Sequence, residues 1–155
     1  MSQSALVRTS SMVVELDVSD LEQSLVFYVS ALGFTVAVDR PERRFAYLTR
    51  DGCVDLMLQS ADGPGERLRT AALERPFGRG VSLMIPCSDV DALFSAFVAT
   101  GGEPITAIDE RTYDIDVLHP TARWSDTGPR RIANRQFVVA DPDGYLLRFY
   151  TERAL

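Results

Sequence analysis

The two halves of this chain open with the same pattern of residues. In each half an alternating apolar run leads to a serine and an aspartate, and then to an aromatic residue and a glycine. At one constant offset the matching pairs are Ser19 with Ser88, Asp20 with Asp89, Tyr28 with Phe97, and Gly33 with Gly102. Self-similarity over a stretch of this length indicates a duplicated supersecondary unit. Two like modules that face each other would enclose a shared cavity, which is where we expect any ligand to bind.

Each module is predicted to be a strand, a helix and three further strands. Residues 12–18 alternate apolar and polar side chains, which is typical of a strand with one buried face. Ser19 or Asp20 is placed to cap a helix with an apolar stripe, and Gly33 is placed to end it. Strands are predicted at residues 34–39, 45–49 and 54–59, the last two joined by a turn at residues 51–52.

The second module repeats this order after a connector at residues 60–80, in which residues 68–73 are compatible with a short helix. A strand at residues 81–86 and a helix after Asp89 precede a short strand at 104–107. Residues 109–135 are predicted to be a long loop that covers the cavity, because loops of that length are commonly functional. A hairpin across residues 141–144 closes the chain.

The predicted fold is therefore a single α+β domain, residues 1–155. Its two tandem βαβββ modules would form a curved mixed sheet around a central cavity. Module one spans about residues 11–60, the connector 61–80, and module two about 81–152.

Composition excludes several classes of function. The formal net charge of -6 argues against a nucleic-acid partner, which would select a basic surface. The sequence has no apolar stretch that approaches a membrane span, and its first residues are polar. Cys53 and Cys87 fall within predicted strands and favour buried thiols in a reducing compartment. We therefore expect a cytoplasmic protein with no membrane contact.

Four strings, in this order on a duplicated frame, resemble the vicinal oxygen chelate superfamily. They are residues 17–21 (DVSDL), 27–28 (FY), 32–34 (LGF) and 141–149 (DPDGYLLRF). This superfamily includes glyoxalase I, extradiol dioxygenases, fosfomycin-resistance enzymes and bleomycin-resistance proteins. The resemblance spans roughly residues 11–152 and implies a homodimer with cavities built from both modules.

The resemblance also implies where a divalent metal ion would be held. Members with a metal place one ligand near the start of each module and one near its end, commonly histidine and then glutamate. Here the opening positions hold Val13 and Ser82, and the closing position of module two holds Arg148. The closing position of module one holds Leu56, or Asp55 or Met57 after a slip of one residue. A guanidinium repels a cation and a valine cannot bind one, so we expect no metal and no other cofactor.

Candidate binding residues follow from strand alternation around these positions. The face of the sheets that lines the predicted cavity would carry Glu15, Asp17, Met57, Ser82, Met84, Arg148 and Tyr150. Arg148 would contact Glu15 or Asp17, or offer its fork to a ligand carbonyl or carboxylate. The two carboxylates favour a cationic ligand or could act as a general base. Trp124 is the expected contact residue of the loop, whereas a packing role is the alternative.

No catalytic residue is assigned, because no nucleophile and base occur in a recognisable arrangement. His119 is the chain's one histidine and reads as structural or solvated. Similarity to the metal-free bleomycin-resistance proteins implies a protein that binds or sequesters a small molecule, with antibiotic resistance as its role. The alternative is a metal-dependent lyase, isomerase or dioxygenase, glyoxalase-like or dioxygenase-like, with a displaced metal site at Asp55, Glu15 or His119. A sensor that uses the cavity for signalling is a third hypothesis.

Overall fold

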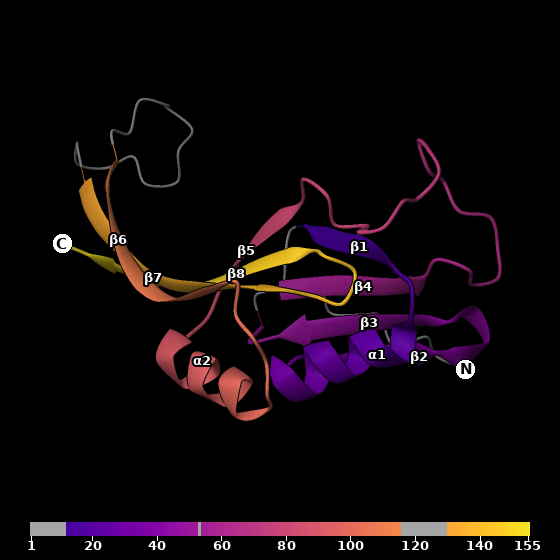
Figure 1. The fold of residues 1–155 in the computed structure, drawn as a ribbon, viewed down its shortest axis with the longest axis horizontal. Helices are drawn as coiled ribbons and strands as arrows, with labels where there is room; N and C mark the ends of the chain where they lie inside the picture. The colour runs from indigo at the N-terminus through magenta and orange to yellow at the C-terminus, as the bar shows by residue number, and fades with distance from the viewer. Residues whose placement is uncertain (1–11, 53, 116–129) are drawn as a thin grey trace. The chain divides into compact units, whose positions relative to one another are not determined.

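A computed structural model describes residues 12–52, 54–115 and 130–155, and divides them into two compact units (Figure 1). The first unit ends at Ser82 and also includes Ala140–Leu146, which is the closing turn of module two. The second unit comprises Leu83–Val139 and Leu147–Leu155. Each unit is described by itself, and a cavity shared between the modules stays a prediction.

The first unit holds one helix and a four-stranded sheet in the order β1-β4-β3-β2. Its elements are β1 (Val13–Val18), α1 (Leu21–Leu25) with a π-helical continuation (Val26–Ala31), β2 (Thr35–Arg40), a 3-10 turn (Pro41–Arg43), β3 (Phe45–Arg50) and β4 (Val54–Ser60). Strand β1 runs parallel to β4, and the other neighbours are antiparallel.

The ends of the first helix follow the predicted signals. The Asp20 carboxylate accepts a hydrogen bond of 3.0 Å from the backbone N–H of Gln23, so Asp20 is the N-cap. Gly33 has a φ of +72°, the left-handed conformation in which a glycine ends a helix without steric cost. Leu21, which follows the cap, begins α1.

The core of the first unit lies between α1 and one face of its sheet. Leu16, Val18, Leu56 and Leu58 are buried there, together with Tyr28 from the helix. Figure 1 shows α1 running along one side of the sheet. The residues of opposite parity on β1 and β4 therefore form the other face, as the alternation predicts.

The second unit repeats the arrangement with the strand order β5-β8-β7-β6. Its elements are β5 (Ser82–Pro86), α2 (Val90–Ala99), β6 (Thr106–Ile115), β7 (Arg130–Ala140) and β8 (Leu146–Ala154). Phe137 of β7 packs edge-to-face against Phe94 of α2 at 5.3 Å and stacks on Phe149 of β8 at 5.6 Å. The two mixed four-stranded sheets confirm the α+β class and the tandem βαβββ order.

Two expectations about connecting segments are wrong. Residues 109–115 and 130–135 form an antiparallel ladder between β6 and β7 rather than a loop, with Asp109 opposite Gln136 and Asp114 opposite Arg131. Within it Thr112, Tyr113 and Ile132 have the branched and aromatic side chains that favour strands. Trp124 and His119 lie outside the described residues, and so does Cys53.

The connector also differs from its prediction, because residues 61–81 contain neither a helix nor a strand. A short helix is stable only when it buries an apolar face against the rest of the protein. Leu68, which would supply that face, is 99% exposed. The connector instead consists of turns, bends and irregular backbone, and its Arg67 and Arg69 bind carboxylates of β1.

Among the described residues, no helix is long and apolar enough to cross a membrane.

Candidate functional site

The polar face of β1 is closed by arginines from the connector. Arg67 donates hydrogen bonds to Glu15 at 2.6 Å and to Asp17 at 2.7 Å. Arg69 donates two more to the Asp17 carboxylate, each at 3.1 Å, and one to the carbonyl of Ala61 at 3.0 Å. Each carboxylate predicted to attract a cationic ligand is thus already paired within its own chain.

The charge of Asp17 is stabilised by these contacts. Burial alone would raise the pKa of its carboxyl, but the hydrogen bonds from Arg69 and Arg67 outweigh burial and hold this pKa below its usual value. Within the first unit, Arg67 and Arg69 already supply partners for both carboxylates, and a contact of either one with Arg148 stays a prediction. Nothing in the local periodicity of residues 61–81 signals these pairs, which join positions far apart in the sequence.

The polar face of the second sheet has a different character. Because Phe137 and Phe149 pack on the helix side, Gln136 and Arg148 lie on the opposite side of β7 and β8. Gln136 is 2% exposed and its neighbour Asn134 is 6% exposed. Among the residues that the structure describes, the buried Nε of Arg148 has no hydrogen-bond partner, nor do the buried side-chain carbonyl oxygens of Asn134 and Gln136.

An ion pair borders this face on β6. Asp109 accepts a hydrogen bond of 2.9 Å from Arg111, and Gln136 also donates to its carboxylate. The Arg111 hydrogen bond holds the pKa of Asp109 below its usual value, with a smaller contribution from the charge of Arg148. Sequence reasoning missed Asn134 because it falls in the segment assigned to a loop, residues 109–135, and missed Gln136 because it directly follows that segment. Their alternation with Arg135 and Phe137 is the signal that could have placed them on a strand.

The other predicted binding residues are spread over both units. Met57 of β4 is half-buried and lies between Glu15 and Tyr47 in the register of the first sheet. Ser82 and Met84 are exposed on β5, and Tyr150 is half-buried on β8. Their part in binding a ligand stays a prediction.

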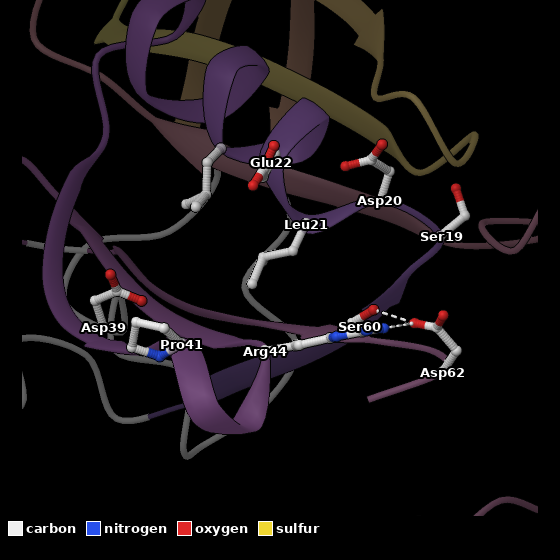
Figure 2. A pocket seen from close by; sticks show the side chains of 10 residues that line it. Ser19, Asp20, Leu21, Glu22, Asp39, Pro41, Arg44, Ser60 and Asp62 are labelled. Atoms are coloured by element: carbon white, nitrogen blue, oxygen red, sulfur yellow. Dashed lines mark hydrogen bonds and ion pairs between the residues drawn. The ribbon is translucent and has the colours of Figure 1, made fainter. Parts of the chain in front are cut away.

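A pocket of about 630 Å³ opens at the start of α1, and none of these residues lines it (Figure 2). Its lining residues are Ser19, Asp20, Leu21, Glu22, Leu25, Asp39, Pro41, Arg44, Ser60 and Asp62. One wall is an ion pair of 2.9 Å between Arg44 and Asp62, and the hydroxyl of Ser60 donates to the same carboxylate at 2.6 Å. Ser60 and Asp62 set a hydroxyl beside a carboxylate, but the hydrogen bonds from Ser60 and Arg44 lower the pKa of Asp62, which makes this carboxylate a weak base.

The closing turn of module two is built into the first unit by buried carboxylates. The hydroxyl of Tyr28 donates to Asp141 at 2.9 Å, and Asp141 also accepts from the backbone N–H groups of Asp143 and Tyr145. The backbone N–H of Ser19 donates to the Asp143 carboxylate at 2.9 Å. Burial raises the pKa of the Asp141 carboxyl, and it raises the pKa of Tyr28 well above its usual value. The sequence predicts the turn here but not its carboxylate contacts.

Comparison with known proteins identifies the family. The profile described as "Glyoxalase/Bleomycin resistance protein/Dioxygenase superfamily" matches residues 12–149. The chain belongs to this superfamily. A comparison with curated proteins finds no match.

Solved structures share the superfamily fold with this chain. TioX from Micromonospora sp. ML1 is 23% identical with a TM-score of 0.63, over 90% of this chain and 96% of TioX. A virulence protein from Salmonella typhimurium is 18% identical with a TM-score of 0.62, over 90% and 93% of the two chains. A glyoxalase/bleomycin resistance protein from Streptomyces sp. CB03234 is 22% identical with a TM-score of 0.53, over 89% and 96%. At these identities the likeness shows the fold alone.

The residues at the superfamily's metal-ligand positions do not fit a divalent ion. Val13 has no donor atom, Ser82 offers one neutral hydroxyl, and Arg148 brings a positive charge. In module one the register sets Met57 beside Glu15, whose carboxylate is bound by Arg67. The described residues hold no cluster of three or more histidine, cysteine, aspartate or glutamate side chains. A displaced site at Glu15 would therefore have to break an ion pair that the chain already makes.

Proposed function

We propose that this protein binds a small organic molecule on the polar faces of its sheets, without a resident metal ion. The observation that carries the proposal is Arg148 at a superfamily metal-ligand position, on the side of β8 that faces away from the helix. A buried guanidinium donor with no partner costs free energy unless something else accepts its hydrogen bond. A ligand with an acceptor group supplies what this strand lacks.

The superfamily name includes bleomycin resistance proteins, a precedent for binding, beside two groups of enzymes, and the arginine at a metal-ligand position favours the binding role. In this proposal the protein sequesters its ligand in the cytoplasm, and resistance to a toxic small molecule is the benefit. The family resemblance further suggests a homodimer. Light scattering during gel filtration tests that part, because a monomer at micromolar concentration would contradict it.

A thermal-shift screen tests the proposed binding directly. A ligand present at a hundred times its Kd stabilises the native state by about 2.7 kcal/mol, which for a chain of this size raises Tm by roughly 5–10 °C. We expect such a shift with at least one class of small molecule, and the same shift after dialysis against a chelator.

Metal analysis of the purified protein is the matched control. Stoichiometric zinc, iron, nickel or manganese, together with a fall in Tm on chelation, would contradict metal-free binding. A library that includes bleomycin-like glycopeptides, aromatic amides and organic acids, and that gives no shift at all, would contradict the binding function itself.

A further inference from the structure

The polar face of the second sheet combines one cation with two neutral acceptors. Arg148 on β8 presents a buried Nε–H, whereas Asn134 and Gln136 on β7 present buried carbonyl oxygens. The described structure provides no hydrogen-bond partner for any of these three atoms. Buried polar atoms in native proteins nearly always have a hydrogen-bond partner. Three such atoms without a partner on one face therefore indicate that a bound molecule supplies the missing hydrogen bonds.

The three side chains lie on neighbouring strands. The β7–β8 ladder is bracketed by backbone hydrogen bonds from Asp141 to Tyr145 at 3.0 Å and from Leu155 to Arg131 at 2.9 Å. Both bonds fit one antiparallel register, which sets Tyr150 opposite Gln136, Arg148 opposite Val138 and Glu152 opposite Asn134. Strands in a sheet are about 4.8 Å apart and rise about 3.4 Å per residue, so a small molecule can contact Arg148 and Gln136 together, whereas only a longer one also reaches Asn134.

The charged side chains on this face determine which kind of anion it can bind. Asp109 is paired with Arg111 at 2.9 Å and Glu152, near the end of β8, is exposed, so Arg148 is the cation on this face whose buried Nε has no hydrogen-bond partner in the described structure. A guanidinium fork matches a planar carboxylate in geometry and charge. A phosphate would turn further oxygens toward the carbonyls of Asn134 and Gln136, which repel them.

The side-chain carbonyl oxygens of Asn134 and Gln136 determine which groups the ligand carries beside its carboxylate. They accept hydrogen bonds and so require N–H or O–H donors close to the carboxylate. An ammonium group beside Arg148 would be repelled, so these donors are neutral amides or hydroxyls.

We propose that this face binds an organic monoacid whose carboxylate pairs with Arg148 and whose neighbouring amide N–H or hydroxyl group donates to Gln136, while a longer ligand also donates to Asn134. The inference rests on the proposed small-molecule binding and names the class of ligand. N-acyl amino acids and hydroxy acids are the simplest members of that class.

Titration calorimetry with matched pairs of probes tests this proposal. The probes are N-acetyl amino acids and α-hydroxy acids, each with its neutral carboxamide. We expect at least one acid to bind at least tenfold more tightly than its carboxamide. Arg148→Met should weaken binding of the acid about 10- to 100-fold, the range for a hydrogen bond to a charged group, and leave the carboxamide unchanged.

Arg135→Met is the control variant, because it removes the same charge from the helix side of the sheet. Arg135 donates to Asp91 of α2 at 2.6 and 2.7 Å and should leave acid binding within about twofold. If Arg148→Met fails to fold, Gln136→Glu places a carboxylate beside Arg148 and should abolish acid binding.

The outcomes separate this proposal from the one on which it rests. Equal binding of an acid to the wild type and to Arg148→Met would overturn the assigned site while small-molecule binding stands. Thermal shifts with other compounds but with no acid would overturn the ligand class alone. Absence of binding by every probe and every library compound would overturn both.

Discussion

The two modules treat the polar faces of their sheets in opposite ways. On the first sheet, Glu15 and Asp17 are neutralised by Arg67 and Arg69 of the connector. On the second sheet, Arg148 has a buried donor that no described residue accepts. Duplication therefore preserved the strand order and the helix caps but not the chemistry of the faces. On the first face the chain itself pairs the charged side chains, whereas on the second face a bound molecule would supply the missing hydrogen-bond partner.

The pockets at the helix starts differ in the opposite sense. The first module's pocket has about 630 Å³, whereas its counterpart at the start of α2 has about 160 Å³. In the second module Arg135 pairs with Asp91 at 2.6 Å and Arg153 pairs with Glu110 at 2.8 Å. All four of these side chains line the smaller pocket. Where one module fills a space with ion pairs, the other leaves it open.

The closing turns give the largest expected difference between the modules. Asp141 accepts three hydrogen bonds in a buried setting, whereas Asp51 of the first module's turn is exposed. Asp141→Ala should lower the free energy of unfolding by about 2–4 kcal/mol, because it leaves the Tyr28 hydroxyl and two backbone N–H groups unpaired. Urea denaturation followed by circular dichroism measures the change.

Asp51→Asn is the matched control for this change. Asp51 has a φ of +52°, which asparagine tolerates, so this variant should stay within about 0.5 kcal/mol of the wild type. Equal losses in the two variants would mean that the buried turn has no special role in stability.

Removing arginines from the two polar faces should shift stability in opposite directions. Arg67→Met leaves Glu15 and half-buried Asp17 short of a partner and should cost about 1 kcal/mol. Arg148→Met removes a buried donor that has no partner and should gain about 0.5–1.5 kcal/mol in the absence of ligand. The same denaturation series measures both. A clear loss in Arg148→Met without ligand would show that the protein itself satisfies this guanidinium.

Alternation and duplication predict most of this fold, because both depend on neighbours along the chain. The cap at Asp20, the end of the helix at Gly33 and the buried parity of Leu16 and Phe149 were all readable in this way. The ion pairs that decide the character of each face were not. Arg67 binds Glu15 across 52 residues of sequence, and no local periodicity encodes which strand a connector side chain reaches.

The β6–β7 ladder was missed for a related reason. The mixture of acidic and basic residues in these strands is typical of a loop. In the structure, however, residues of opposite charge face each other across the ladder, as Glu110 faces Arg135. Recognising that would have placed Asn134 and Gln136 on the same face as Arg148. The missed site residues thus follow from one wrong assignment of secondary structure.

The smallest expected effect is a difference in pH dependence between Asp17 and Asp141. The pKa of Asp17 is lowered in the folded state, so its contribution to stability is present above the unfolded pKa near 3.9 and is lost as the pH falls through the folded value. The pKa of Asp141 is raised, so its protonation favours the native state. That contribution is present in full below the unfolded pKa and is lost as the pH rises through the folded value.

The two substitutions should therefore change the acid limb of the stability curve in opposite directions. Asp17→Asn should flatten the loss of stability on acidification below about pH 4, because no charge at this site remains to be neutralised. Asp141→Asn should steepen the loss from neutral pH down to that range, since the compensating gain from protonation disappears. Urea midpoints measured at intervals between about pH 3 and pH 7 give both slopes. Slopes that change in the same direction would contradict either the paired charge of Asp17 on β1 or the buried carboxyl of Asp141 in the closing turn. Arg67→Met decides between them, because it should reproduce the effect of Asp17→Asn if the charge of Asp17 is paired as described.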